Sequence, residues 1–172
     1  MKLSRTLRTC ILSICAALTC VAAVTSQTFA GAPDIRISQV YGAGGGTGAT
    51  FKNDFIELHN RGTTTVDLTG WSVQYASSAG TGWQVTALSG SIAPGGYFLV
   101  AEAGGAIGAN LPTADVTGAI GMNANNGKIA LLTTSTLIAF GTGCPITSMT
   151  PGLVDFVGYG TANCFEGAGA TG

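Results

Sequence analysis

Three residues whose side chains can do acid–base or metal chemistry, Asp54, Glu57 and His59, lie within six consecutive positions. A glutamate and a histidine on one strand face can form an acid–base pair or bind a metal ion weakly. His59 is the only histidine of the chain, so no second imidazole is available to complete a transition-metal shell. Strand periodicity places Glu57 and His59 on the same face, which we interpret as a solvated face. We therefore predict no catalytic residue and no metal site, and we keep the three residues only as weak metal candidates.

Calcium is the ion whose ligands this region could best supply. Asp54 and the neighbouring Asn53 offer oxygen atoms of the kind found in loose extracellular calcium sites. Their spacing does not match an EF-hand loop, and the chain has no Gly-x-Ser-x-Gly motif to position a nucleophilic serine. We expect a protein that is not an enzyme and needs no cofactor. A calcium- or carbohydrate-binding loop at residues 42–54 is a minor alternative.

The glycine-rich segment 42–49 contains Gly44, Gly46 and Ala49 at the spacing of a dinucleotide-binding fingerprint. That fingerprint requires a helix directly after the glycines, because the helix N-terminus binds the pyrophosphate. Residues 51–60 instead alternate as a strand does. We predict a hairpin loop here and no nucleotide site.

The first 30 residues have the three-part layout of a secretory signal peptide. A basic start precedes an uncharged apolar run at residues 10–24, and small residues follow up to Ala30. We predict cleavage after Ala30 and a secreted, extracellular or periplasmic protein. The alternative is a retained membrane anchor. The 15-residue run is shorter than the roughly 20 residues that span a bilayer, so we expect no stable anchor.

Removing this segment makes the chain acidic. The full sequence has 7 basic and 8 acidic residues, and its first 30 residues hold 3 basic and no acidic ones, which leaves 4 against 8 and a net charge of −4. Nucleic-acid binding depends on cations that neutralise phosphates. We therefore expect no direct nucleic-acid binding.

Two cysteines, Cys144 and Cys164, remain after the predicted cleavage. A pair of cysteines in an exported protein favours a disulfide bond. The alternatives are two unrelated thiols or pairing with a cysteine of another chain. Two cysteines without a nearby histidine cannot complete a zinc site.

The rest of the sequence predicts an all-β fold. Its 27 glycines and many threonines disfavour helix, and apolar residues alternate with polar ones as half-buried strands require. We interpret residues 54–75 as a three-stranded β-meander, with Trp71 and Trp83 as core anchors. Short strands separated by turns are typical of a β-sandwich. The further strands are expected at residues 35–41, 83–88, 97–101 (a central strand), 128–132, 136–140 and 154–159.

Three segments carry a resemblance to a known family: DFIELHNRG at 54–62, VDLTGWSVQY at 66–75 and IAPGGYFLVAEAGG at 92–105. They resemble the lamin tail domain of bacterial secreted proteins. The sequence is similar in particular to the copy that precedes the catalytic domain of extracellular nucleases of the endonuclease/exonuclease/phosphatase type. The resemblance implies an immunoglobulin-like antiparallel β-sandwich. We assign this domain to residues 31–166, after a signal peptide at 1–30 and before a Gly/Ala-rich tail or truncation point at 167–172.

Two functions are consistent with these observations. The first is a secreted, non-catalytic interaction or targeting module that binds a protein, a cell-surface polymer or a linked enzyme domain. The second is the N-terminal part of an extracellular nuclease whose catalytic domain is missing from this chain. The motivation for the second is the short Gly/Ala-rich end after Glu166.

Overall fold

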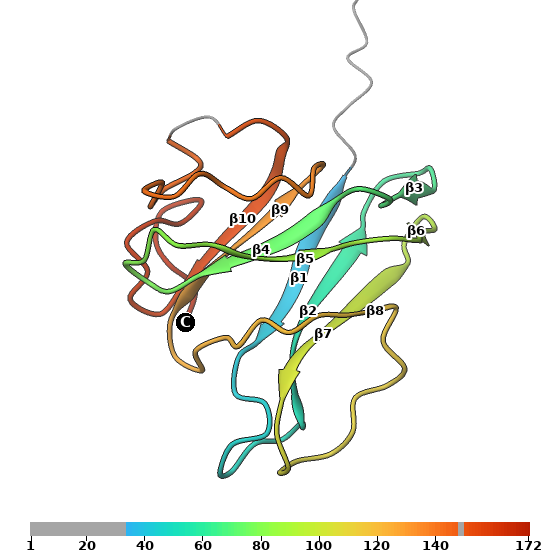
Figure 1. The fold of residues 1–172 in the computed structure, drawn as a ribbon. Helices are drawn as coiled ribbons and strands as arrows, with labels where there is room; N and C mark the ends of the chain where they lie inside the picture. Colours follow the sequence, from blue (N-terminus) through green and yellow to red (C-terminus); the bar gives the residue numbers. More distant parts are fainter. Residues whose placement is uncertain (1–33, 148–149) are drawn as a thin grey trace, which may run out of the picture.

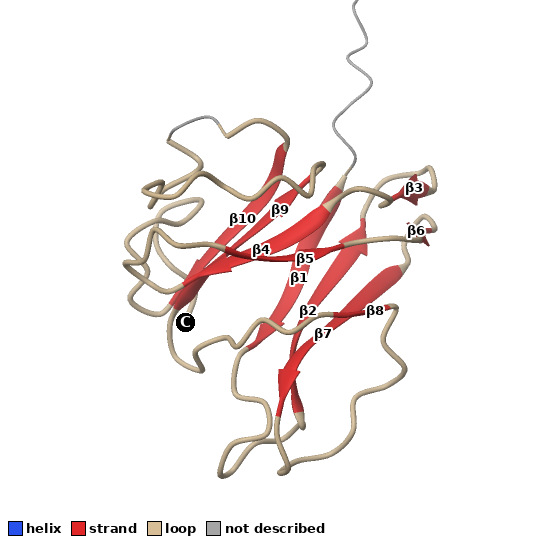
Figure 2. Cartoon of the chain, viewed as in Figure 1, coloured by secondary structure: helices blue, strands red, loops and turns tan. Residues whose placement is uncertain are grey.

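The structure is a computed structural model that describes residues 34–147 and 150–172. The predicted signal peptide and its cleavage site at Ala30 lie outside these residues. Strands and loops account for all of the described chain (Figures 1 and 2). The strands are β1 (Ile35–Tyr41), β2 (Asn53–Asn60), β3 (Val66–Asp67), β4 (Ser72–Ala76), β5 (Gln84–Ala87), β6 (Ser91–Ile92), β7 (Tyr97–Gly104), β8 (Val116–Thr117), β9 (Gly127–Leu132) and β10 (Leu153–Tyr159).

Two four-stranded sheets face each other as a sandwich. The first sheet has the strand order β1-β2-β7-β8 and the second has β10-β9-β4-β5, while β3 and β6 form a small separate pair. All neighbours pair antiparallel except β7 and β8. The predicted all-β sandwich is confirmed, and the strand expected at 97–101 is an interior strand, β7, of the first sheet.

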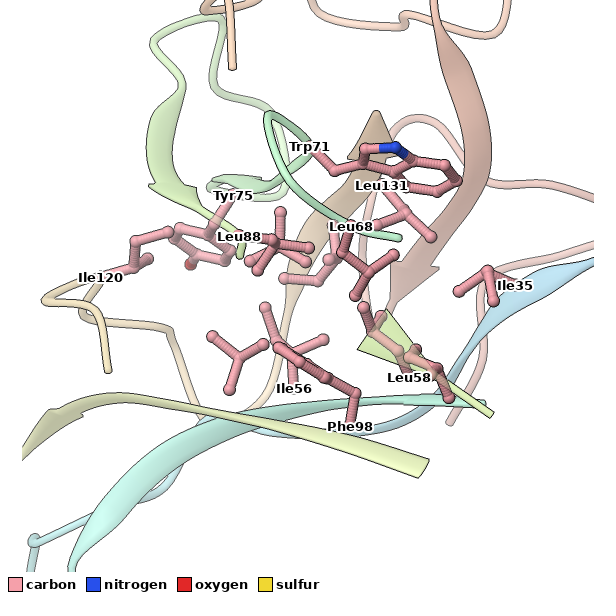
Figure 3. Packing of buried hydrophobic residues seen from close by; sticks show 14 of the residues in the cluster. Ile35, Ile56, Leu58, Leu68, Trp71, Tyr75, Leu88, Phe98, Ile120 and Leu131 are labelled. Atoms are coloured by element: carbon pink, nitrogen blue, oxygen red, sulfur yellow. The ribbon is translucent and has the colours of Figure 1, made fainter. Parts of the chain in front are cut away.

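The alternation of apolar residues produces the core between the sheets. Every second residue of β2 is buried, so Ile56 and Leu58 point inward together with Phe98 of β7. Trp71 packs against this cluster from the opposite side (Figure 3). Each fully buried side chain of this kind contributes about 1.5–3 kcal/mol relative to an exposed one, so these strands supply much of the stability of the sandwich.

The predicted meander at residues 54–75 is wrong, although its strands exist. β2 pairs with β1 and β7, β3 pairs with β6, and β4 pairs with β5 and β9. The chain therefore leaves one sheet after Asn60 and enters the other at Ser72. Gly70, with a φ of 84°, takes a left-handed conformation that an L side chain rarely adopts just before the chain joins the second sheet. Alternation predicts which face is buried, but it does not predict the partner strand.

The two interior strands of the second sheet, β4 and β9, are buried on both faces. The outer face of this sheet forms a second apolar cluster, which includes Trp83, Leu132, Ile138 and Phe156. Ser72 and Gln74 lie on this face and are fully buried. Polar residues between apolar ones usually indicate a solvated face, so alternation alone does not reveal this second layer.

A connection of residues 118–123 closes one end of the sandwich and is held by side chains from several strands. The amide of Ile120 donates to Glu102 Oε2 at 2.9 Å, and the amide of Met122 donates to Asp54 Oδ2 at 2.7 Å. The amide of Asn123 donates to the Tyr75 hydroxyl at 3.0 Å. Polar side chains therefore provide the partners that a strand would otherwise give this buried backbone.

The two sheets also meet at their edges, where β1 lies beside β10. The amide of Ile37 donates to Asp155 Oδ2 at 2.7 Å. A carboxylate that binds an edge amide occupies the position a neighbouring strand would need. The described residues include no helix long and apolar enough to span a membrane.

Candidate binding site

The residues that the sequence singled out for chemistry do not form one site. Asp54 points into the sandwich and is buried, whereas Glu57 and His59 lie on the outer face of the same strand. Glu57 accepts a hydrogen bond from the Ser38 hydroxyl at 2.7 Å. His59 stacks on Tyr97 of β7, with ring centroids 4.4 Å apart. The face carrying Glu57 and His59 is thus half-buried and partly aromatic, not simply solvated.

The oxygen atoms considered for calcium make structural hydrogen bonds. Asp54 Oδ1 accepts from the amide of Gly44 at 2.8 Å, while Oδ2 binds the 118–123 connection. The Asn53 side chain donates to the carbonyl of Glu102 at 2.9 Å. Within residues 34–147 and 150–172, no group of three or more His, Cys, Asp or Glu side chains could hold a metal ion.

A buried carboxyl that the sequence did not flag is Glu102, on the core-facing side of β7. Its Oε1 atom and the hydroxyl of Thr86 are both buried and make no hydrogen bond among the described residues. Burial is the main cause that raises the pKa of Glu102; hydrogen bonding, including that from the amide of Ile120, opposes the rise, and the charge of Asp54 adds to it. A Cβ atom at Gly118 would collide with Thr86 Oγ1 and Glu102 Oε2, so a larger residue there would have to displace both side chains. One feature of the sequence could have identified Glu102. It places a carboxyl at an inward-facing position of a strand that is otherwise apolar.

We expect Glu102→Gln to make the protein more stable at pH 8 than the wild type, by about 1–3 kcal/mol for an unpaired buried group. The pKa of Glu102 is raised above 4.5 in the folded state, so the folded protein binds more protons than the unfolded chain between the unfolded and folded pKa values. Its stabilising contribution is fully present below pH 4.5 and is lost as pH rises through the folded pKa. Thermal melts from pH 4 to 8 measure this, with the exposed Glu166→Gln as control. Parallel melting curves for Glu102→Gln and wild type would contradict it.

A long loop covers part of the outer face of the second sheet. We define the flap as residues 133–147 and 150–152. Its first part was predicted as a strand at 136–140, and that prediction is wrong because no strand pairs with it. The fully buried side chain of Gln74 serves instead, donating to the carbonyl of Thr136 at 2.9 Å and accepting from the amide of Ile138 at 2.9 Å. The Ser72 hydroxyl binds the carbonyl of Thr134 at 2.7 Å.

Lys128 of β9 fixes the next part of the flap. Its side chain is 0% exposed, and Nζ donates to the carbonyls of Gly80 (2.8 Å) and Gly143 (2.7 Å) and to Asn163 Oδ1 (3.0 Å). The Trp83 ring lies 5.8 Å from the ammonium, within the range of cation–π attraction. Burial lowers the pKa of Lys128. One buried cation thus joins three loops through all three of its N–H groups.

The disulfide bond between Cys144 and Cys164 anchors the far part of the flap, which confirms the predicted pairing. Cys144 follows Gly143 and Cys164 follows Asn163, so the covalent link lies next to two of the three Lys128 acceptors. A bond of this kind forms and persists in an oxidising compartment.

Replacing both cysteines with serine should lower the free energy of unfolding by about 3 kcal/mol, as the loop-entropy estimate gives for a loop of this size. Urea denaturation of the Cys144→Ser/Cys164→Ser variant measures the loss. A reductant should lower the stability of the wild type to that of the variant and leave the variant unchanged. A variant as stable as the oxidised wild type would rule out a stabilising role.

The flap borders a cavity of about 640 Å³. Its lining is largely apolar, with threonines among the apolar side chains, and includes Leu132, Leu137, Ile138 and Pro151. Next to the cavity, Phe140 is 90% exposed and Leu137 is 48% exposed. A cavity of this size and lining is typical of binding sites. Exposed apolar patches beside such a cavity mark interaction surfaces.

Sequence reasoning missed this site because it interpreted residues 136–140 as a strand. A usable signal was present: residues 133–154 carry no charged side chain. A stretch that long without charge is either core or interface. In the structure Ile138 is buried, whereas Leu137 and Phe140 are exposed.

The model of one protein family, the Lamin Tail Domain, matches residues 28–161. A comparison with curated proteins gives no significant match. The family match covers well over half of the 172 residues and agrees with the antiparallel sandwich described above. The chain therefore belongs to the lamin tail domain family.

Proposed function

We propose that this protein is an exported, non-catalytic binding module whose contact surface is the flap. The observation that carries the proposal is Phe140, which is 90% exposed on a loop that the structure otherwise holds in place. Gln74, Lys128 and the disulfide bond each attach the flap to the sandwich. Binding through an exposed apolar side chain costs little conformational entropy when the loop that carries it is already ordered.

The side chains of the flap surface indicate which chemical groups its partner presents. The cavity beside Phe140 is mainly apolar, with threonine side chains in its lining. Large aromatic anchors that enter or flank apolar cavities dominate interface energetics. The partner classes that fit are a protein, a cell-surface polymer with apolar faces, or a linked enzyme domain.

The test is retention on the envelope of the producing cell. Fluorescently labelled wild-type protein should bind the cells, and Phe140→Ser should weaken this binding about tenfold or more because a central anchor is lost. The matched control is Ile107→Ser, which removes an apolar residue that is 47% exposed in the β7–β8 connection, at the other end of the sandwich (Figure 1). Equal binding by the wild type and Phe140→Ser would refute the flap as the contact surface.

A linked nuclease of the endonuclease/exonuclease/phosphatase type is the second proposal. It is supported by the resemblance of residues 54–75 and 92–105 to the domain that precedes such enzymes. In this case the flap would dock on the catalytic domain. The DNA downstream of codon 172 decides the matter, because a frameshifted nuclease reading frame supports this proposal and an unrelated gene rejects it.

A further inference from the structure

The flap presents a projecting side chain and a cavity on the same surface. Phe140 is exposed, and the residues directly before it, Leu137, Ile138 and Ala139, line the cavity. A patch that contains both a knob and a hole is self-complementary. Two copies related by a twofold axis can each insert the knob into the hole of the other, which is the arrangement of an isologous interface.

The charge distribution indicates where two copies can meet. The chain after residue 30 has 4 basic and 8 acidic residues, a net charge of −4. Lys128, Asp54 and Glu102 are buried, which leaves 3 basic and 6 acidic residues, a net charge of −3, outside the core. Two such molecules repel each other where their charged faces approach. Residues 133–154 carry no charge, so contact through the flap brings no like charges together.

The attachments of the flap prepare it for this contact. The segment around Phe140 is bound on one side through Gln74 to Thr136 and Ile138, and on the other through the Trp83 indole, which donates to the carbonyl of Thr142 at 2.7 Å. Both side chains are buried in the sandwich. A contact surface fixed in this way loses little freedom on association.

We propose that the partner of the flap is a second copy of this chain, in a twofold dimer in which Phe140 of each copy occupies the flap cavity of the other. This inference rests on the proposed function, because it names the occupant of the same surface. The dimer is held by apolar burial and not by ion pairs. Its affinity should therefore stay constant or rise between 0.1 and 1 M salt, where charge-based contacts weaken.

The experiment is sedimentation velocity on the secreted, disulfide-bonded protein over a concentration series. The wild type should show a reversible dimer. Phe140→Ser and Leu137→Ser should each weaken dimerisation about thirtyfold or more, the loss expected for a hot-spot residue. Ile107→Ser should leave it unchanged. Circular dichroism and melting temperature show that each variant is folded, which is expected because the replaced side chains are exposed.

The possible results separate this inference from the function it rests on. A wild type that is monomeric throughout the series, or a dimer that persists in Phe140→Ser, overturns the dimer. If the wild type is monomeric and Phe140→Ser still loses envelope binding, the flap binds another partner and only the dimer is wrong. If the wild type is dimeric and Phe140→Ser binds the envelope normally, the dimer stands and the proposed function fails.

Discussion

Replacing Lys128 with methionine should lower the free energy of unfolding by about 3 kcal/mol. Methionine fills the space of the lysine stem but cannot donate hydrogen bonds. The carbonyls of Gly80 and Gly143 and the side-chain oxygen of Asn163 would each lose a charged donor at 2.7–3.0 Å. Hydrogen bonds to charged groups contribute about 1.5–3 kcal/mol each, and water can replace only part of this at the partly buried acceptors. Urea denaturation measures the loss, with Lys52→Met as the charge-matched control.

An opposing effect makes this experiment informative. A buried charge is costly to desolvate, and replacing a buried ion pair by apolar residues is often neutral or stabilising. Here the acceptors remain in place after the substitution, so the unpaired carbonyls should outweigh the removed desolvation cost. If Lys128→Met is as stable as the wild type, the desolvation cost of the ammonium is as large as the contribution of its hydrogen bonds.

The pH dependence checks the same residue independently. Burial lowers the pKa of Lys128 below its usual 10.5, so between the folded and unfolded pKa values the unfolded chain binds more protons. Stability contributed by this group therefore rises with pH across that window. The deficit of Lys128→Met relative to the wild type should widen toward pH 10. Burial raises the pKa of Tyr159, which changes stability with pH in the opposite direction. Tyr159 is present in both proteins, so its effect cancels in the stability difference between Lys128→Met and the wild type.

Replacing Asp54 with alanine should also cost about 3 kcal/mol. Its carboxylate accepts the amides of Gly44 and Met122 at 2.8 and 2.7 Å, and both donors would be left without a partner in the sandwich end. A buried donor without a partner costs about 1–3 kcal/mol. Asp54→Asn keeps one acceptor oxygen and should lose about half as much. Chemical denaturation of the two variants gives the comparison.

The neighbouring outer-face residues supply the control for Asp54. Glu57 and His59 lie on the opposite face of β2, and substitutions on a partly exposed face usually change stability by less than about 1 kcal/mol. Glu57→Ala and His59→Ala should therefore be mild. Equal losses at positions 54, 57 and 59 would mean that the two faces of β2 are not distinguished as the structure shows.

Sequence reasoning was accurate where one physical rule acted alone. The alternation of β2 correctly placed Ile56 and Leu58 in the core, because side-chain direction in a strand follows from the backbone. The pairing of Cys144 with Cys164 was also predicted correctly. Both inferences needed only local geometry or cysteine number.

Sequence reasoning failed where long-range contacts decide the local structure. Ser72 and Gln74 alternate as solvent-facing residues do, yet the flap covers them and uses their hydrogen-bonding groups. Residues 136–140 have the composition of a strand but pair with a glutamine side chain instead of a backbone. Lys128 opens a strand whose other residues are apolar, and only the three-dimensional structure brings Gly80, Gly143 and Asn163 to it. No local pattern places the flap over the second sheet, because residues from distant segments hold it there.

The pairing of the outermost strands sets how the domain responds to pulling. β1 pairs antiparallel with β2 along its length, and its first half is fastened to Asp155 of β10. Thr171 pairs with Tyr159, the last residue of β10, and that end of β10 shares a cavity with the far end of β1. A force applied between the start of β1 and the C-terminus therefore acts along the strands. The ladder hydrogen bonds lie perpendicular to the strands, so they share this load in shear instead of opening one by one. A module that fastens one object to another at a cell surface would resist tension well in this geometry.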